Sequence, residues 1–287
     1  MKIRLGIILT LALFSISSTA LVIRYLDGVP ALVLAFWRMI TASIMLWGFS
    51  AFRPKKTLSL EQKKLILFAG FFLGCHFACF FLGVRNTSIA NATFLGCMLP
   101  VFTVFIEYFQ KKNNNKMTYY GLVVALAGAG IIQWEGLSIA DENIFGNFIA
   151  LLGALFIAIT FIIAGKVREN TDTVVYGRML FFVAGITLLI ISSLAGDSVF
   201  QISSKHIPWI IFLGFVPSIL GHNMLNYALK YTSPTSIASL PLGEPILASL
   251  FGFLIFNETI PVGAIAGGPI ILIGVFLILR HQPLNSD

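Results

Sequence analysis

Charged residues are scarce in this chain of 287 residues, where they make up 11% of the sequence. An ordinary soluble domain carries about 25% charged residues. Hydrophobic residues reach 57%, and the mean hydropathy is +0.92. So few charges cannot cover the surface of a soluble fold, which argues against a soluble enzyme, a nucleic-acid reader and a disulfide scaffold. The composition indicates a protein built for the lipid bilayer.

Cysteine and the common catalytic motifs are also lacking. The three cysteines lie in apolar stretches and do not suggest a disulfide framework. Cys75 and Cys79 flank His76, but no second cluster at ligand spacing accompanies them, so we expect core packing and no bound metal. The sequence contains no His-Glu-x-x-His helix, no Gly-x-Ser-x-Gly turn and no Gly-x-x-x-x-Gly-Lys-Ser/Thr loop. We therefore expect neither an enzyme, nor a cofactor, nor direct use of ATP.

Long apolar runs, in contrast, fill nearly the whole sequence. Runs of about 18 or more apolar residues predict transmembrane helices, and charged or turn-forming breaks divide the chain into ten of them. No break is long enough for an extramembrane domain, so the function is expected inside the helix bundle. The predicted spans are 5–23, 30–52, 65–84, 87–109, 117–134, 144–164, 174–195, 208–229, 234–256 and 262–279.

The first predicted span has a second interpretation. Lys2 and Arg4 precede an apolar run that ends near residues 17–20, a pattern that a cleaved signal peptide also shows. Its removal would leave nine spans, which the distribution of basic residues and the internal repeat described below both disfavour.

Membrane topology explains the excess of 19 Lys and Arg over 12 Asp and Glu. Lys and Arg concentrate in the cytoplasmic loops of membrane proteins. With the N-terminus in the cytoplasm, most basic residues fall inside, and only Arg24, Arg85 and Lys205 fall outside. We therefore expect a multi-pass protein of the plasma membrane, the inner membrane of a bacterium, with both termini cytoplasmic. No nucleic-acid partner is needed to explain the charge.

The two halves of the chain resemble each other. Phe36-Trp37-Arg38-Met39 resembles Tyr176-Gly177-Arg178-Met179, and further matched positions lie at similar offsets near half the chain length. An odd number of spans in each unit would insert the second copy upside down, which is the inverted-repeat plan of many secondary transporters. The further matched pairs are His76 and His222, Pro100 and Pro245, Gly121 and Gly267, and Gly128 and Gly274.

Several of these motifs together resemble the EamA-type transporters of the drug/metabolite transporter superfamily. They are the Arg-Met pair early in each unit's second span, the stretch 87–92 leading to Pro100-Val101-Phe102, its partner 228–233 leading to Glu244-Pro245-Ile246-Leu247, and the Gly267 to Gly274 spacing. The resemblance implies an all-α fold of ten transmembrane helices, built as two inverted five-helix repeats at 3–136 and 143–281. It also implies a central cavity lined by both repeats.

One position departs from that family. The family pattern has an acidic residue at the end of the fourth span of each unit. The second unit fits this pattern with Asn257-Glu258, whereas the first unit reads Gln110-Lys111-Lys112 and has no acid there. If that acid contributes to a gate, the two gates are not equivalent. Glu107 stands four residues before Lys111, a spacing typical of a helical ion pair.

Charged residues deep in a span are the first candidates for the transport pathway, because they are costly in lipid and normally face a cavity or a partner. Arg38 lies about 12 Å inside its predicted span at 1.5 Å per residue. Arg178 lies closer to its end, where snorkelling is an adequate explanation. Glu244, between Gly243 and Pro245, is either a substrate or proton site or a structural hydrogen-bonding group.

Polar residues of the predicted spans 65–84, 87–109, 208–229 and 234–256 complete the proposed pathway. Histidines within a bundle can carry protons near neutral pH, although a lone buried histidine is more often a satisfied polar group. Prolines interrupt helices and supply candidate hinges or gates. The pathway candidates are His76, Asn91, His222, Asn223 and Asn226, and the hinge candidates are Pro100, Pro241 and Pro245.

The leading hypothesis is a secondary transporter that moves small organic metabolites by alternating access. The resemblance favours amino acids or related compounds as substrates and export as the direction. The expected partners are the small-molecule substrate, the lipid bilayer and protons, and proton antiport, exchange and facilitated diffusion are all compatible with the sequence. The alternatives are a non-transporting membrane assembly or receptor protein and an intramembrane enzyme. Nothing in the sequence indicates an oligomeric state.

Overall fold

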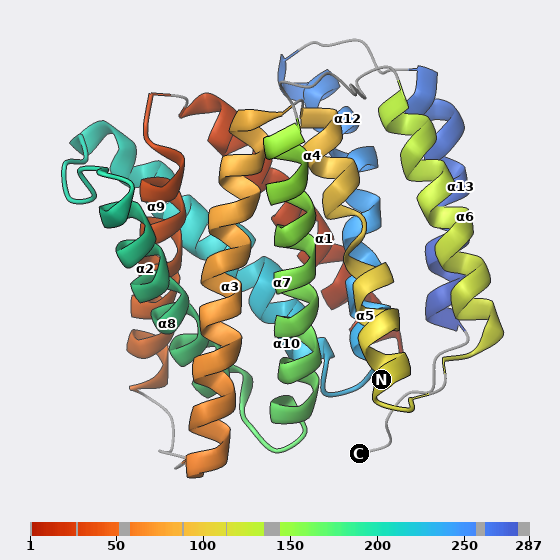
Figure 1. Ribbon diagram of the computed structural model, residues 1–287, viewed down its shortest axis with the longest axis horizontal. Helices are drawn as coiled ribbons and strands as arrows, with labels where there is room; N and C mark the ends of the chain where they lie inside the picture. The colour runs from red at the N-terminus through yellow and green to blue at the C-terminus, as the bar shows by residue number, and fades with distance from the viewer. Residues whose placement is uncertain are drawn as a thin grey trace.

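The computed structural model describes residues 2–26, 28–51, 58–87, 89–112, 114–134, 144–256 and 262–280. Within these ranges the protein contains helices and no strands (Figure 1), in agreement with the predicted all-α class. The α-helices are α1 (Lys2–Tyr25), α2 (Ala31–Ser50), α3 (Leu60–Asn86), α4 (Ile89–Gly96), α5 (Leu99–Phe109), α6 (Lys116–Gln133), α7 (Ile144–Arg168), α8 (Thr173–Leu194), α9 (Ile207–Leu213), α10 (Met224–Ala228), α11 (Pro234–Ala238), α12 (Glu244–Phe256) and α13 (Val262–Arg280). The 3₁₀ segments η3 (Ser204–His206) and η5 (Leu240–Gly243) and the π-helical segment η4 (Gly214–Asn223) connect some of them.

Eight of the described segments are long and apolar enough to cross a membrane. Two of them join neighbouring elements, because Asn91–Phe109 covers most of α4 and all of α5, and Ser204–Ala228 runs from η3 to α10. The other two predicted spans, 117–134 and 234–256, coincide with α6 and with the α11–η5–α12 segment. The 18 residues of α6 correspond to about 27 Å, close to the roughly 30 Å of a hydrocarbon core.

Proline lies at the breaks within two of the predicted spans. Pro100 is the second residue of α5, Pro241 the second residue of η5 and Pro245 the second residue of α12. Proline has no N–H to donate, and the first turn of a helix does not need one, so each proline fits the start of a new segment. The three predicted hinge residues therefore lie at helix starts and not inside continuous helices.

Pro217 is the fourth residue of η4. A π-helix pairs each N–H with the carbonyl five residues earlier, so the first turn of η4 does not need an N–H from Pro217. The side chain of Ser218 donates to the carbonyl of Leu213, with Oγ 2.8 Å from Leu213 O. Long π-helical segments are rare and often mark functional sites, and no sequence pattern considered above predicts this one.

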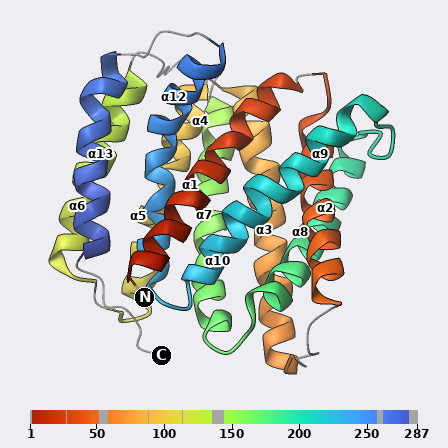
Figure 2. The ribbon, with the colours of Figure 1, turned by 180° about the vertical axis from the view of Figure 1, so that it is seen from behind.

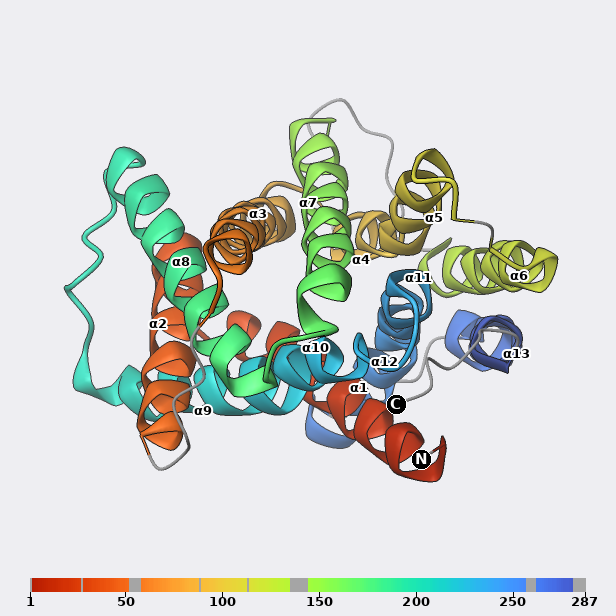
Figure 3. The same cartoon turned by 90° about the horizontal axis from the view of Figure 1, so that it is seen from below.

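Helices from the two halves of the chain interleave in the bundle (Figure 3). α3 packs against α7 and α8, and α2 packs against α8. Glycine permits the close approach of α3 to α8, because a Cβ on Gly70 would lie 2.6 Å from Val183 and a Cβ on Gly74 would lie 2.6 Å from Thr187. These small residues serve helix packing, as small residues commonly do in membranes.

α6 and α13 form a pair at one edge of the bundle (Figures 1 and 3). Their backbones touch at two glycine positions. A Cβ on Gly121 would lie 2.6 Å from the carbonyl oxygen of Gly274, and a Cβ on Gly128 would lie 2.8 Å from that of Gly267. A larger residue at either position would push the two helices apart.

The bundle has two ends, which we call proximal and distal. α1 begins and α7 ends at the proximal end, where α13 also ends, whereas α3 ends and α7 begins at the distal end (Figures 1 and 2).

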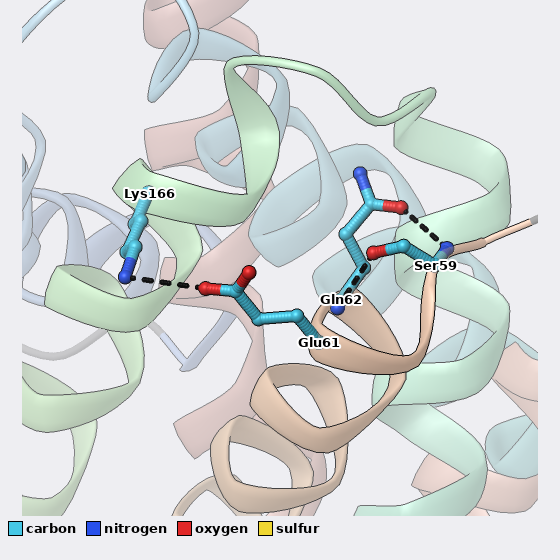
Figure 4. Close-up of polar contacts among 4 residues, drawn as sticks. All are labelled: Ser59, Glu61, Gln62 and Lys166. Carbon is cyan, nitrogen blue, oxygen red and sulfur yellow. Dashed lines mark hydrogen bonds and ion pairs between the residues drawn. The ribbon is translucent and has the colours of Figure 1, made fainter.

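At the proximal end α3 begins with a capping box (Figure 4). Ser59 Oγ accepts from the backbone N–H of Gln62, and Gln62 Oε1 accepts from the backbone N–H of Ser59. Gln62 Nε2 also donates to Thr171 Oγ1 at 3.0 Å. Lys166 Nζ lies 3.6 Å from Glu61 Oε1, but both side chains are exposed, so this ion pair adds little stability. The cap ties the start of α3 to the connection between α7 and α8.

Candidate transport cavity

A cavity of about 310 Å³ lies within the bundle. Gln133 at the end of α6 and Ala150 near the start of α7 belong to its wall, which places it in the half of the bundle nearer the distal end. Cavities of this size suit small metabolites. Six of the residues predicted from the sequence line it: Arg38, His76, His222, Pro241, Glu244 and Pro245.

The guanidinium group of Arg38 is only partly hydrogen-bonded by neighbouring residues. Its side chain is 1% exposed, and its Nε donates to Ser218 Oγ at 2.9 Å. The guanidinium carbon lies 4.5 Å from the ring centroid of Phe77, a cation–π contact. Nη2 has no hydrogen-bond partner among the described residues. One edge of the guanidinium is thus fixed, and the other edge retains a donor for a ligand.

Ser218 holds Arg38 through the oxygen of its hydroxyl group. The hydroxyl hydrogen is directed to the carbonyl of Leu213, and the hydroxyl oxygen then accepts from Arg38 Nε. A serine of η4 therefore orients the principal cation of the cavity. The sequence analysis missed Ser218, although a serine directly after a proline in an apolar span was the available signal.

Both predicted histidines gather around the same aromatic ring. The ring centroid of His76 lies 4.8 Å from that of Phe77, and the centroid of His222 lies 5.3 Å from it. His76 Nδ1 lies 2.8 Å from the carbonyl oxygen of Gly153. A carbonyl only accepts, so Nδ1 carries the proton and Nε2 of the neutral ring is an acceptor. Phe77, which the sequence analysis also missed, is the common neighbour of Arg38, His76 and His222.

Glu244 supplies the acidic group of the cavity. It is the first residue of α12 and follows directly on η5, so the chain places it at the break between two helical segments. Its charge and that of Arg38 interact electrostatically. Among the described residues no hydrogen bond or ion pair joins these two side chains. The cavity therefore contains a basic and an acidic side chain that do not bind each other directly.

Asn91 lies near the cavity but is not part of its wall. Its side chain is 4% exposed, and Nδ2 donates to Asn147 Oδ1 at 2.8 Å. Thr87 Oγ1 donates to the same oxygen at 2.7 Å. These bonds connect the start of α4 to α7 near the distal end. In the cavity wall itself, Gln133 Nε2 donates to Thr93 Oγ1 and links α6 to α4.

Asn223 and Asn226 are likewise outside the cavity wall, on its proximal side. The carbonyl oxygen of Asn226 accepts from Arg168 Nε at 3.0 Å, and Asn223 Oδ1 packs so closely on Gly177 that a Cβ there would collide with it. The structure thus divides the predicted pathway residues between the cavity and a second polar region.

Glu107 joins α5 to α11 near the proximal end. Its side chain is 2% exposed, and Oε2 accepts from Thr235 Oγ1 at 2.5 Å and from Asn114 Nδ2 at 2.9 Å. The predicted helical pair with Lys111 is wrong, because α5 ends at Phe109 and Lys111 has a positive φ of 58°. The two side chains therefore do not share a helical face.

The sequence pattern of the EamA-like transporter family matches the chain twice, at residues 4–134 and 144–280. A pseudopaline exporter, CntI, from Pseudomonas aeruginosa is 24% identical over 280 residues, which are 96% of each chain. An uncharacterized transporter from Clostridium kluyveri is 28% identical over 71% of this chain and 68% of its own. An uncharacterized inner membrane transporter, YedA, from Escherichia coli is 25% identical over 85% of this chain and 80% of its own.

One solved crystal structure supports the fold independently. It superposes with a TM-score of 0.80 over 96% of each chain, although only 16% of the residues are identical. At that identity the likeness concerns the fold alone. The family pattern, in contrast, covers nearly the whole sequence in both of its matches. This multi-pass membrane protein belongs to the EamA-like transporter family.

Proposed function

We propose that this protein is a secondary transporter that exports small zwitterionic metabolites, amino acids or related compounds, by alternating access to the cavity. The observation that carries the proposal is the separation of Arg38 from Glu244. Both line the cavity, and no direct bond joins them within the described structure. Charges at this depth are costly unless they serve a partner. A substrate that carries both a carboxylate and an ammonium group satisfies the two at once.

The contacts of Arg38 and Glu244 define how such a substrate binds. Its carboxylate accepts from Nη2 of Arg38, the donor that lacks a partner in the described structure, because guanidinium groups bind carboxylates with matched geometry. Its ammonium group donates to Glu244. Phe80 and Phe161, which also line the cavity, offer apolar surface to the remaining part of the molecule.

The chain forms ten membrane spans in two inverted repeats, at 3–136 and 143–281. Two observations support this part of the proposal. The family pattern matches once in each half. In the two halves Gly121 matches Gly267, and Gly128 matches Gly274. Exchanging the halves therefore turns the contact of Gly121 with Gly274 into the contact of Gly267 with Gly128, which the structure also contains. A two-fold axis between α6 and α13 requires such reciprocity.

Both termini lie in the cytoplasm of a bacterium, and the protein lies in its inner membrane. Lys166, Arg168 and Arg280 lie near the proximal end, which agrees with the preference of basic residues for the cytoplasmic side. The distal end then faces outward, and the cavity lies on the outward side of the contact between Glu107 and Thr235. A relative named an exporter supports the direction of transport.

Transport rather than catalysis is the activity of the site. Both the family and the relatives are transporters. Protons are the proposed coupling partner, because Glu244, His76 and His222 line the cavity and carry side chains that can bind and release them.

Reconstitution in liposomes tests the proposal. A panel of labelled amino acids and, for comparison, nucleotides is offered to the purified protein with and without a pH gradient. We expect amino-acid flux well above that of empty liposomes, and a loss of at least about tenfold in Arg38→Gln, since a charged hydrogen bond is worth about 1.5–3 kcal/mol.

Lys166→Gln is the matched control. It removes one positive charge from an exposed side chain at the proximal end, and its flux should equal that of the wild type. The proposal fails if the wild-type protein moves none of the amino acids, or if Arg38→Gln transports them as well as Lys166→Gln does.

A further inference from the structure

A second group of buried polar side chains lies on the proximal side of the cavity. Arg168 ends α7, Tyr176 lies in the first turns of α8, Asn223 ends η4 and Asn226 lies in α10. Their exposures are 2%, 0%, 1% and 3%, respectively. None of them belongs to the cavity wall. We call these four residues the proximal cluster.

Contacts with each other and with neighbouring residues of α8 position the members of the proximal cluster. Arg168 Nε donates to the carbonyl oxygen of Asn226 at 3.0 Å, and Arg168 Nη2 donates to Thr173 Oγ1 at 2.5 Å. Tyr176 lies close enough to Arg168 for the two groups to interact electrostatically. Asn223 Oδ1 packs on Gly177, the residue that follows Tyr176.

Each member of the proximal cluster has a polar atom without a hydrogen-bond partner in the part of the chain that the structure describes. These atoms are Arg168 Nη1, Tyr176 Oη, Asn223 Oδ1 and Asn226 Oδ1. Buried polar atoms are nearly always paired, and an unpaired one is costly. Four of them in one place indicate a site whose partner is another molecule. Arg38 in the cavity shows the same pattern, with one edge of the guanidinium held and Nη2 left over.

We propose that the proximal cluster is a second binding site for the charged end of the substrate, used when the protein opens toward the proximal side. Arg168 Nη1 and Tyr176 Oη donate to a carboxylate, and the side-chain oxygens of Asn223 and Asn226 accept from an ammonium group. The donors and acceptors are thus complementary to an amino-acid backbone. This inference rests on the proposed transport of zwitterionic metabolites, and it adds Arg168 and Tyr176 to the residues that recognise them.

η4 connects the two sites. Ser218 in η4 holds Arg38 at the cavity, and Asn223 at the end of the same segment belongs to the proximal cluster. A shift of η4 therefore changes both sites together. The π-helical geometry of η4 is suited to such a shift, because π-helical turns frequently occur at functional sites.

Transport measured separately from each face of the membrane tests this inference. The probe is a labelled mixture of L-amino acids, applied to vesicles in which either the proximal or the distal face points outward. We expect Arg168→Gln to raise the half-saturating concentration from the proximal face by about tenfold, and to change it less than about twofold from the distal face. Lys166→Gln, two residues away on the exposed side of α7, should change neither value.

Tyr176→Phe distinguishes binding from a structural role. Its hydroxyl has no partner within the described structure, so its removal should leave the thermal stability of the protein unchanged. The same variant should raise the half-saturating concentration from the proximal face several-fold. It also keeps the inference testable if Arg168→Gln does not fold.

Three results would overturn the inference. Unchanged half-saturating concentrations in Arg168→Gln and Tyr176→Phe would leave the cluster without a role in binding. An equal increase from both faces would indicate a general effect on the fold. In both cases wild-type transport of amino acids would leave the proposed function intact, whereas a wild-type protein that moves no amino acid from either face overturns both proposals.

Discussion

Ser218 Oγ accepts a hydrogen bond of 2.9 Å from Arg38 Nε, although the two residues are 180 positions apart in the sequence. The bond joins α2 of the first half to η4 of the second. It fixes the only edge of the guanidinium for which the structure provides a side-chain hydrogen-bond partner among the described residues. The orientation of the cavity cation therefore depends on a serine in the other half of the chain.

Replacing this serine should weaken substrate binding. Ser218→Ala removes the acceptor for Arg38 Nε, and because hydrogen bonds to charged groups are worth about 1.5–3 kcal/mol, we expect the half-saturating concentration of an amino-acid substrate to rise about tenfold or more. Transport kinetics in liposomes measure this. Ser15→Ala is the control, since Ser15 Oγ donates only within its own helix, to Leu11 O. Equal kinetics in the two variants would contradict the role of Ser218.

The carboxyl group of Glu244 should couple transport to protons. Glu244→Gln retains hydrogen bonding but cannot ionise, so we expect a pH gradient to stimulate the variant little or not at all, while exchange of substrate across the membrane continues. Glu244→Ala should lose exchange as well, because it also removes the group that binds ammonium. Unchanged pH dependence in both variants would exclude Glu244 as the proton site.

The bond between Glu107 and Thr235 should stabilise the packing of α5 against α11 at the proximal end. Glu107→Leu removes the shared acceptor of Thr235 Oγ1 and Asn114 Nδ2, and each hydrogen bond lost in this way costs about 0.5–1.5 kcal/mol. Thermal unfolding in detergent should show a lowered midpoint for Glu107→Leu and a much smaller change for Glu107→Gln, which can still accept from Thr235. A Leu variant as stable as the wild type would show that this contact does not hold the proximal end.

Close packing of α6 on α13 should depend on glycine at position 128 and not at position 130. A Cβ on Gly128 would lie 2.8 Å from two backbone atoms of α13, whereas a Cβ on Gly130 meets nothing closer than 3.6 Å. Gly128→Ala should therefore destabilise the protein by about 1–3 kcal/mol through overpacking. Gly130→Ala should be neutral or slightly stabilising, because alanine favours the helix over glycine by roughly 0.5–1 kcal/mol. The thermal midpoints of the two variants should differ accordingly.

Much of the fold could be predicted from the sequence, because the bilayer imposes a simple rule on apolar runs. α2, α7, α8 and α13 lie close to their predicted spans. The breaks inside 87–109 and 234–256 were less predictable than the spans themselves, since proline signals a break without specifying which residue begins the next helix. The π-helical geometry of η4 had no sequence pattern at all.

Only the charged residues of the candidate site could be predicted from the sequence. Arg38 and Glu244 stand out in apolar spans because burying a charge requires a reason. Asn223 and Asn226 stand out in the same way, yet they lie outside the cavity wall, since a polar residue in a span indicates burial among polar partners and not which ones. Ser218 and Phe77 are ordinary in sequence, and only their contacts with Arg38 identify them.

Composition and apolar periodicity alone thus specify a helical membrane protein, its approximate spans and the charges that demand an explanation. They do so because lipid penalises each exposed charge and each unpaired backbone group locally, within one helix. The tertiary structure decides which of those charges meet. No single helix encodes how helices far apart in the chain pack together. That packing determines the bond between Arg38 and Ser218, the lack of a bond between Arg38 and Glu244, and the assembly of the proximal cluster.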